Sequence, residues 1–351
     1  MTAQAAQPAQ EAQAQQPLLS VQDLKIRIQM DNGEMNAVDG VDFEIHKGKT
    51  LGLVGESGCG KSLTSRAIIS INPKECETTG TIMYQSSTEE SLNHLNLLSL
   101  DTNGKHIRSI RGRKIAMIFQ EPMTAFSPMY TIGNQIMEAI LIHRTKNKKE
   151  AKKITLEMLA KVGISDQEKR FDQYPHEFSG GMRQRAMISM ALSCNPELLI
   201  ADEPTTALDV TIQAQVLELM KALQEEFGMA ILLVTHDLGI IAEMCDEVAV
   251  MYLGKIIEQA PVKEIFHHPK HPYTKGLLKS MPRLGGNKSK RLDSIEGSVP
   301  IPINMPPMCG FYDRCKDRIE GVCNVQAVPK TRLSDKHMVR CFLYSDQHEG
   351  A

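Results

Sequence analysis

The stretch that most constrains this chain is Gly55-Glu-Ser-Gly-Cys-Gly-Lys-Ser62, which matches the pattern G-x-x-x-x-G-K-S. The apolar run at 50–54 precedes it and predicts a buried strand, and residues 63–70 can form a helix. A strand, a glycine-rich turn and a helix N-terminus together make an anion site, because backbone N–H groups point inward and the helix dipole favours negative charge. The sequence therefore predicts a loop that binds the phosphates of a nucleoside triphosphate.

The residue types in this loop suit phosphate binding. The glycines allow the backbone to curve closely around phosphate without a Cβ atom in the way. Lys61 can reach the β- and γ-phosphates, and the Ser62 hydroxyl can bind Mg²⁺. We expect the loop to contact the nucleotide through Gly55, Ser57, Gly58, Cys59, Gly60, Lys61, Ser62 and Leu63.

Cys59 lies inside this loop, at a helix N-terminus and close to Lys61. Both features stabilise a thiolate, so we expect a lowered pKa and a thiol that alkylating reagents reach easily. The alternative is that Cys59 is a small residue that fits its place and has no further role.

A second motif follows about 140 residues later, where the apolar run Leu198–Ala201 ends in Asp202 and Glu203. A strand of this kind carries Asp202 to the carboxyl edge of the sheet, beside the phosphate loop, where a carboxylate can hold Mg²⁺. Glu203 is then placed to polarise a water molecule for attack on the γ-phosphate. The two motifs together predict hydrolysis as well as binding.

The order of the elements predicts an α/β fold. Residues 18–48 alternate as short strands, and buried strands are expected at 115–119, 198–202, 230–234 and 248–252, with helical spacing from 132 to 162. Because strands alternate with helices, we expect a mostly parallel sheet covered on both faces. Residues 85–106 are polar and predict an exposed insertion.

A third motif, Phe178-Ser-Gly-Gly-Met182, opens a helix and offers a second anion site. The order of the motifs along the chain resembles that of the ATP-binding subunits of ABC transporters, and the resemblance covers about residues 18–260. It implies a phosphate-loop core, an antiparallel β subdomain and a helical subdomain near 125–195. The motifs that carry it are the phosphate loop, Gln120, Ser179-Gly-Gly181, Asp202-Glu203, Asp209 and His236.

The resemblance implies a role for each of these residues. Gln120 resembles the glutamine that touches Mg²⁺ or the attacking water and senses the membrane partner. Ser179, Gly180 and Gly181 resemble the signature that completes the ATP site of the opposite subunit. Asp209 is similar to the aspartate at the dimer seam, and His236 to the histidine that contacts the γ-phosphate. The implied catalytic residues are Glu203, His236 and Gln120, and the implied Mg²⁺ ligands are Ser62, Gln120 and Asp202.

The chain departs from the broad family pattern at two of its motifs. Met182 stands where the signature usually has glutamine, but the serine and glycines that contact phosphate remain. Ile28 stands near the place of an aromatic residue that usually stacks on adenine, so an apolar contact replaces stacking.

The resemblance is closer to one subfamily, the dipeptide/oligopeptide and nickel importers. It rests on residues 178–185, 209–215, His271-Pro-Tyr-Thr274 and a Cys-containing C-terminal segment. It implies ATP-driven peptide import through two membrane permease subunits, with an extracytoplasmic peptide-binding protein delivering the cargo. It also implies a second ATPase subunit and a peripheral location on the cytoplasmic face of the cell membrane. The subfamily usually pairs two different ATPases, but both half-sites are intact here, so the sequence does not say whether the partner is a paralogue or a copy of the chain. The sequence does not identify the solute.

Composition excludes several other classes of protein. A formal net charge of −2 gives no support for nucleic-acid binding. No stretch approaches the ~18 consecutive apolar residues of a membrane-spanning helix. Residues 1–17 are rich in alanine and glutamine and lack the basic and apolar regions of a signal peptide, so they predict a flexible tail.

The C-terminal extension, residues 261–351, contains a linker at 285–290 and four of the chain's eight cysteines: Cys309, Cys315, Cys323 and Cys341. A reducing compartment disfavours disulfides, which leaves zinc, an iron–sulfur cluster or no metal. Zinc sites usually contain a tight C-x₂₋₄-C pair, and none occurs among these four. The resembled subfamily includes members with a [4Fe–4S] cluster here, and we expect one. Cys76, Cys194 and Cys245 are expected to be buried and inert.

The motifs leave two alternatives to a role in transport. One is an ABC ATPase of translation or DNA repair, but such proteins usually carry two cassettes or a long coiled-coil insertion. The other is a metal-binding sensor built on an inactive nucleotide fold, and the presence of Lys61 and Glu203 argues against it. A GTPase is disfavoured because no N-K-x-D guanine motif occurs.

Overall fold

The structure is a computed structural model that describes residues 16–86, 88–89, 92–120, 125–206, 208–281 and 295–345. Its centre is an eight-stranded sheet with the order β11-β12-β10-β9-β3-β8-β7-β6. The parallel part consists of β3 (Thr50–Val54), β6 (Ile115–Ile118), β7 (Leu198–Asp202), β8 (Ala230–Thr235) and β9 (Glu247–Tyr252). The predicted parallel sheet is confirmed, with strand bounds that differ from the expected ones by a residue at most.

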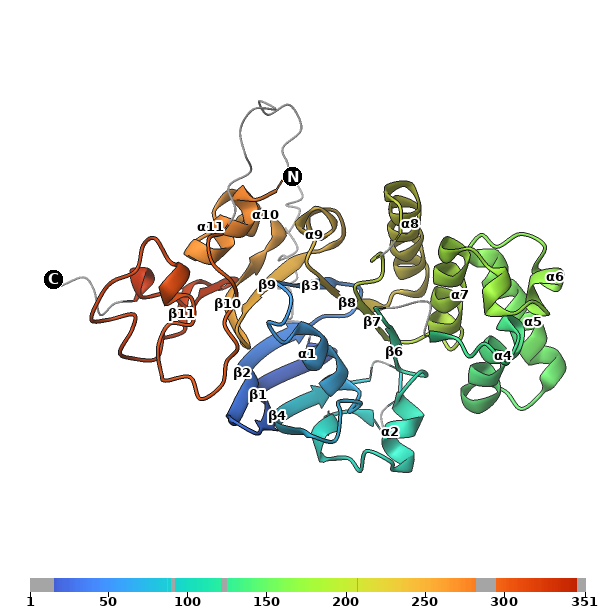
Figure 1. Cartoon of the computed structure of the whole chain (residues 1–351). Coiled ribbons are helices and arrows are strands. Elements are labelled where there is room, and N and C mark those ends of the chain that lie inside the picture. The colour runs from blue at the N-terminus through green and yellow to red at the C-terminus, as the bar shows by residue number, and fades with distance from the viewer. Residues whose placement is uncertain are drawn as a thin grey trace, which may run out of the picture.

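Each face of this sheet belongs to a different hydrophobic core. Along β7, Leu198 and Ile200 belong to one core, whereas Leu199 and Ala201 belong to the other. This alternation follows from the two-residue period of a strand, and it explains why the strands are apolar throughout. Helices α8 (Val210–Phe227) and α9 (Leu238–Met244) cover one face, and α1 (Lys61–Ile68) covers the other (Figure 1).

A second sheet lies on the α1 side and is antiparallel, with the order β2-β1-β4-β5 (Figure 1). Its strands are β1 (Leu19–Met30), β2 (Gly33–Ile45), β4 (Cys76–Tyr84) and β5 (Leu95–Asn96). The expected turn at 31–33 joins β1 to β2. The expected antiparallel portion is therefore present.

The prediction that 85–106 is an exposed insertion is wrong in part. Within it, Leu92 and Leu97 are buried and pack into the core beneath the antiparallel sheet. These leucines anchor a segment that contains β5 and the 3₁₀ helix η2 (Leu97–Ser99), ahead of α2 (Lys105–Ile110). A few apolar side chains in a polar stretch are enough to fix it to the core.

The helical part projects from the β6–β7 edge of the large sheet (Figure 1). It contains α4 (Ile132–His143), α5 (Lys148–Lys161), α6 (Gln167–Phe171), the 3₁₀ helix η3 (Pro175–Glu177) and α7 (Gly180–Leu192). The side chains of Ile136, Ile140, Met158 and Leu159 recur at helical spacing and are buried. In the part of the chain that is described, no helix is long and apolar enough to cross a membrane.

The C-terminal extension adds strands to the opposite edge of the large sheet. Its elements are α10 (Val262–His267), α11 (Pro272–Lys279), β11 (Thr331–Ser334), β12 (His337–Val339) and the 3₁₀ helices η4 (Tyr312–Arg314) and η5 (Phe342–Tyr344). Strand β12 pairs with β10 (Lys255–Pro261), which itself pairs with β9. The expected linker at 285–290 and most of the expected tail at 1–17 lie outside the described residues. The extension thus continues the main sheet, which sequence reasoning did not foresee.

Candidate nucleotide site

The phosphate loop connects β3 to α1, which begins at Lys61, two residues earlier than expected. Gly60 has a φ of 100°, a conformation that L side chains rarely adopt. Gly55 is needed for a different reason, because a Cβ atom there would lie 2.2 Å from the carbonyl oxygen of Met251. The loop is therefore curved as expected and fits closely against the end of β9.

Lys61 is buried within the loop that it belongs to. Its Nζ donates to the carbonyl oxygens of Gly55, at 2.7 Å, and Glu56, at 3.0 Å. Both acceptors belong to the phosphate loop, so these two contacts hold the charged Nζ atom within the loop. An anion bound by the loop meets a lysine that is already in position.

Ser62 and Asp202 meet across the two motifs, with Ser62 Oγ donating to Oδ1 of Asp202 at 3.1 Å. The side chain of Asp202 is fully buried at the carboxyl end of β7, and its Oδ2 has no hydrogen-bond partner among the described residues. Burial raises the pKa of Asp202. A hydroxyl and a carboxylate with an unpaired oxygen form a donor set suited to Mg²⁺, which prefers oxygen ligands.

Glu203 follows directly and has a left-handed backbone conformation, with a φ of 48°. Its N–H donates to the carbonyl oxygen of Val234 at 2.8 Å, which fixes this turn to the end of β8. Positive φ values are uncommon outside glycine and occur often in functional sites. The turn directs the glutamate side chain to the edge where β7 and β8 end.

Three side chains surround the Glu203 carboxylate. The Nε2 atom of Gln120 donates to Oε2 at 3.1 Å, Nδ1 of His236 lies 3.1 Å from Oε1, and Thr206 Oγ1 donates to Oε2 at 2.9 Å. Burial pushes the pKa of Glu203 upward, but the hydrogen bonds from His236 and Thr206 outweigh it, and the pKa lies below its usual value. The group is an ionised acceptor, as a base for water activation must be.

The structure thus brings together Lys61, Ser62, Asp202, Glu203, Gln120 and His236, all of which the sequence motifs singled out. Thr206 was missed. Its position three residues after Glu203, in the turn before α8, is the signal that could have found it.

The signature residues and Asp209 lie away from this cluster. Ser179 is the N-cap of α7 and accepts from the Met182 N–H at 3.3 Å, and Asp209 caps α8 in the same way. Gly181 lies against α8, because a Cβ atom there would approach Ile212 to 2.9 Å. The signature therefore lies next to the turn that contains Asp209. In Figure 1, strands β6 and β7 lie between α7 and α1.

The prediction of a lowered pKa for Cys59 is wrong. Its thiol is buried, and burial raises its pKa, although Lys61 acts in the opposite direction. The helix N-terminus cannot activate a thiol that solvent does not reach. Of the cysteines expected to be buried, Cys245 is buried and Cys76 and Cys194 are half-buried, and burial raises the pKa of all three.

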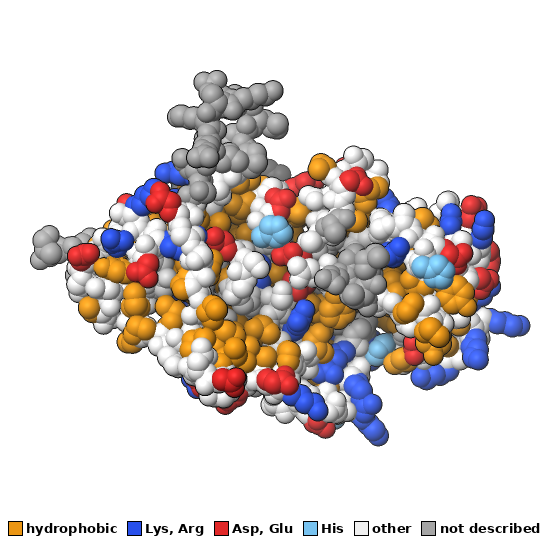
Figure 2. All heavy atoms as spheres, in the orientation of Figure 1, with side chains coloured by type: hydrophobic (Ala, Val, Ile, Leu, Met, Phe, Trp, Pro, Cys, Tyr) orange, Lys and Arg blue, Asp and Glu red, His pale blue; other side chains and the backbone are white. Residues whose placement is uncertain are grey.

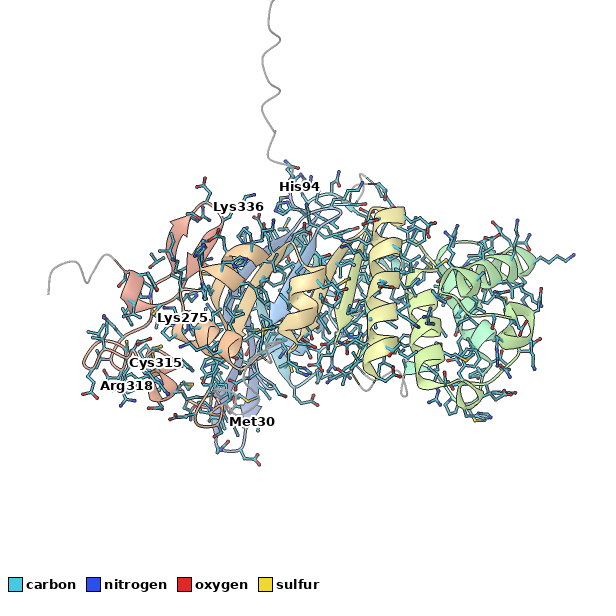
Figure 3. All side chains as sticks on the ribbon, turned by 90° about the horizontal axis from the view of Figure 1, so that it is seen from above. Met30, His94, Lys275, Cys315, Arg318 and Lys336 are labelled. Carbon is cyan, nitrogen blue, oxygen red and sulfur yellow. The ribbon has the colours of Figure 1, made fainter. Side chains whose placement is uncertain are left out.

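The four C-terminal cysteines line one cavity of about 10 Å³, together with His271, Phe311 and Phe342. Cys315 lies in this extension near Arg318 (Figure 3). Burial, and then the neighbouring thiols, raises the pKa of Cys309 to about 12 and of Cys341 to about 11. Even so, no group of three or more His, Cys, Asp and Glu side chains in the described ranges is arranged to hold a metal ion. The donors share a cavity without forming a closed site.

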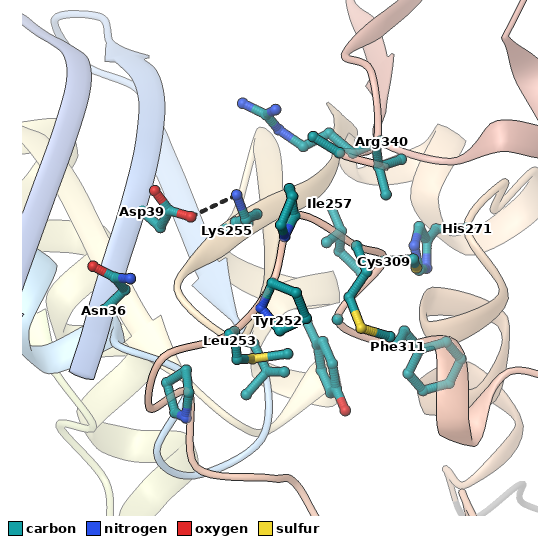
Figure 4. A pocket seen from close by; sticks show the side chains of 18 residues that line it. Asn36, Asp39, Tyr252, Leu253, Lys255, Ile257, His271, Cys309, Phe311 and Arg340 are labelled. Atoms are coloured by element: carbon teal, nitrogen blue, oxygen red, sulfur yellow. Dashed lines mark ion pairs between the residues drawn. The ribbon is translucent and has the colours of Figure 1, made fainter. Parts of the chain in front are cut away.

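A larger cavity of about 280 Å³ lies between β2, β10 and the extension (Figure 4). Its wall includes Tyr252, Cys309 and Phe311, and the ion pair between Asp39 and Lys255 lies on the opposite side. This cavity is separate from the phosphate loop residues described above.

Comparison with known proteins gives two family matches. Residues 38–206 match the ABC transporter family, and residues 257–323 match the oligopeptide/dipeptide transporter C-terminal region. The dipeptide transport ATP-binding protein DppD of Bacillus subtilis is 48% identical over 95% of this chain and 97% of its own length. The oligopeptide transport ATP-binding protein AppD of the same organism is 49% identical over 95% of this chain and 98% of its own length.

Among solved structures, the ATP-binding cassette MJ0796, in a dimeric post-hydrolysis state bound to ADP and Pi, is 23% identical with a TM-score of 0.60. It covers 70% of this chain and 98% of that protein. The cbiO1 subunit of the ABC transporter complex cbiONQ from Clostridium perfringens is 25% identical with a TM-score of 0.58, over 72% of this chain and 91% of its own.

Proposed function

Because the chain belongs to the ABC transporter ATP-binding proteins that carry an oligopeptide/dipeptide transporter C-terminal region, we propose that its ATP hydrolysis powers peptide import. The chain is an ATPase of this family. We assign residues 18–260 to the nucleotide-binding domain, with a helical subdomain at about 125–195, and residues 261–351 to the extension.

One observation carries the proposed mechanism: the carboxylate of Glu203 is held between Gln120 and His236 at the end of β7. In this proposal Glu203 accepts a proton from the water that attacks the γ-phosphate, since it is ionised and fixed on both sides. Lys61 binds and orients the β- and γ-phosphates from within the loop. His236 and Gln120 orient the base and meet the γ-phosphate side of the substrate.

Ser62 and Asp202 would hold Mg²⁺, with Gln120 as a further ligand, and the ion would neutralise charge developing on the phosphate oxygens. The unpaired Oδ2 atom of Asp202 supports this assignment, because burying an unpaired carboxylate oxygen is costly without a cation.

The remaining motif residues suggest a dimer. Ser179 and Gly180 are exposed and Gly181 is half-buried at the start of α7, away from the phosphate loop of the same chain (Figure 1). Such a helix N-terminus suits the phosphates of a nucleotide bound to an opposite subunit. We therefore propose a head-to-tail pair that closes on two ATP molecules, with Asp209 at the seam and a paralogous ATPase as the second subunit.

The proposed membrane partners are two permease subunits, to which an extracytoplasmic peptide-binding protein delivers the cargo. Met129 and Tyr130, between Gln120 and α4, are 77% and 61% exposed. Hydrophobic side chains also reach the surface over helices α4 to α7 (Figure 2). Large exposed apolar side chains in the segment that follows Gln120 suit a partner that responds to ATP. The chain would then sit peripherally on the cytoplasmic face of the membrane.

We also propose that Cys309, Cys315, Cys323 and Cys341 hold a [4Fe–4S] cluster. The support is that all four thiols line one small cavity, together with His271, Asp317 and aromatic side chains. Binding would have to draw the thiols together and deprotonate them. Anaerobic purification should give iron and sulfide near four per chain. Stoichiometric zinc in colourless anaerobic protein would overturn the cluster.

The transport proposal is tested by co-purifying the chain with its permease partners and reconstituting the complex in proteoliposomes with a library of short peptides. Peptide uptake that requires ATP, and that Lys61→Ala abolishes, supports it. ATP hydrolysis by a chain that never associates with permeases would overturn the role in transport while leaving the ATPase intact.

A further inference from the structure

The C-terminal extension reaches into the phosphate loop through one arginine. The guanidinium of Arg314, at the end of η4, binds the carboxylate of Glu56 in two places: Nη1 lies 2.7 Å from Oε2 and Nη2 lies 3.0 Å from Oε1. Glu56 is the second residue of the phosphate loop. Two parallel hydrogen bonds of this kind fix orientation as well as position.

The arginine of this ion pair is buried and has further partners, whereas the Glu56 side chain is 30% exposed. The Arg314 side chain is only 5% exposed. Its Nε donates to the carbonyl oxygen of Glu296 at 3.0 Å, and its Nη1 lies 3.3 Å from the Tyr252 hydroxyl. The guanidinium also lies over the rings of Tyr252 and Phe311, at 5.8 and 5.9 Å from their centroids. These two rings line the larger cavity in Figure 4. A charge held in this way has little freedom to move.

Every polar part of Glu56 is engaged. Its carboxylate binds Arg314, its N–H donates to the hydroxyl of Tyr273 at 2.9 Å, and its carbonyl oxygen accepts from Lys61 Nζ at 3.0 Å. Tyr273 is fully buried on α11. Two elements of the extension therefore hold the residue that in turn holds the phosphate-binding lysine.

From these contacts we propose that Arg314 is a positioning residue for nucleotide binding, acting through Glu56 on Lys61 and the phosphate loop. The proposal rests on the assignment of this loop to ATP. Arg314 directly precedes Cys315, in the segment that begins at Cys309. On this proposal, a change in the packing of Cys309 and Cys315 would move the guanidinium of Arg314 and thereby alter the affinity for ATP.

The test compares the full chain with Arg314→Lys, Glu56→Gln and the double variant. Arg314→Lys keeps the charge but loses the two-fold contact. For each single variant we expect the Kd of a fluorescent ATP analogue to rise about 10-fold, within the usual range of coupling between sites. We expect KM to rise, whereas kcat should stay within about threefold of the value for the unchanged chain, because Glu203 and its partners are not altered. The double variant should be no worse than the single ones, because both act on one interaction.

The matched control is Lys316→Gln, which changes an 81% exposed side chain two residues away and should leave the Kd unchanged. Thermal unfolding and iron content are measured on every variant. If the variants lose stability or iron while their Kd for the ATP analogue stays within twofold of that of the unchanged chain, the ion pair is only structural and the proposal fails. The proposal also fails if the effects of the two single substitutions on the Kd add in the double variant. If Lys61→Ala binds ATP as the unchanged chain does, the loop assignment itself fails.

Discussion

The Nδ1 atom of His236 lies 3.1 Å from Oε1 of Glu203, and this contact joins the ends of β8 and β7. The same carboxylate accepts a hydrogen bond from Gln120 on its other oxygen. Glu203→Gln keeps the shape of the side chain but removes its basicity. We expect it to bind ATP normally, to hydrolyse it about 10²–10⁴-fold more slowly and to accumulate as an ATP-bound dimer. Hydrolysis rates and size-exclusion chromatography with ATP check this, and near-normal turnover would remove Glu203 from the role of base.

The hydrogen bond from His236 also predicts a pH dependence. It is one of the contacts that lower the pKa of Glu203, so the carboxylate stays ionised to lower pH than an ordinary glutamate. In His236→Ala this contribution is lost, and the pKa of Glu203 should rise. The acidic limb of the kcat profile should therefore move to higher pH, in addition to any general loss of rate. A profile that is lower but not shifted would show that His236 does not tune the base.

Asp202 predicts a conflict between stability and function. Burial raises its pKa from 3.8, so the ionised form destabilises the nucleotide-free fold as pH rises above that value. Asp202→Asn removes the charge, keeps an oxygen for Ser62 and does not titrate. We expect the free energy of unfolding of the variant to exceed that of the unchanged chain by about 1–3 kcal/mol at pH 8, and this difference to shrink toward pH 4. Its Mg²⁺-dependent hydrolysis should be lost. Urea unfolding at the two pH values without nucleotide checks the sign, and equal differences at both would contradict it.

Sequence reasoning performed best where one short stretch carries both the fold and the chemistry. The phosphate loop requires a strand before it and a helix after it, so residues 50–68 follow from the pattern alone. Asp202 and Glu203 could be placed beside that loop because the carboxyl ends of parallel strands share an edge.

The contacts of the extension could not be predicted in this way. Arg314 and Glu56 are 258 residues apart, and neither belongs to a periodic pattern that would pair them. Strand β12 is three residues long, too short for alternation to reveal it. For Cys59 the local rule gave the wrong direction of the pKa shift. Cys59 is buried in the core that also contains Val38 and Met251, and that burial depends on the fold and not on the loop sequence.

The corrected view of Cys59 makes its own prediction. A buried thiol with a raised pKa should react with N-ethylmaleimide about 100-fold more slowly than a free thiol at pH 7.4, with or without Mg-ATP. Mass spectrometry of labelled peptides over time measures this. Cys76, which is half-buried at the end of the antiparallel sheet, provides the comparison within the same chain. Rapid labelling of Cys59 that Mg-ATP prevents would restore the expectation of an activated thiol.

The buried carboxylate of Glu258 ties the extension to the core. It is fully buried on β10 and accepts from the N–H groups of Lys270 and His271, at 2.7 and 2.9 Å, while Nε2 of His337 on β12 lies 2.9 Å from Oε1. Glu258→Ala leaves three polar groups without their acceptor, so we expect a loss of about 3–5 kcal/mol in the free energy of unfolding. Glu296→Ala, at an 80% exposed carboxylate in the same extension, is the control and should have no measurable effect.

Because Glu258 joins β10, β12 and the segment before α11, the unchanged chain should lose the extension and the core in one transition. In metal-free protein, urea unfolding followed by circular dichroism should then coincide with the exposure of Cys309, Cys323 and Cys341 to a thiol reagent. In Glu258→Ala the thiols should become reactive at a lower urea concentration than the one that unfolds the core, because β12 loses the contact of His337 with the buried carboxylate. Thiol exposure that precedes core unfolding already in the unchanged chain would contradict this and make the extension an independent unit.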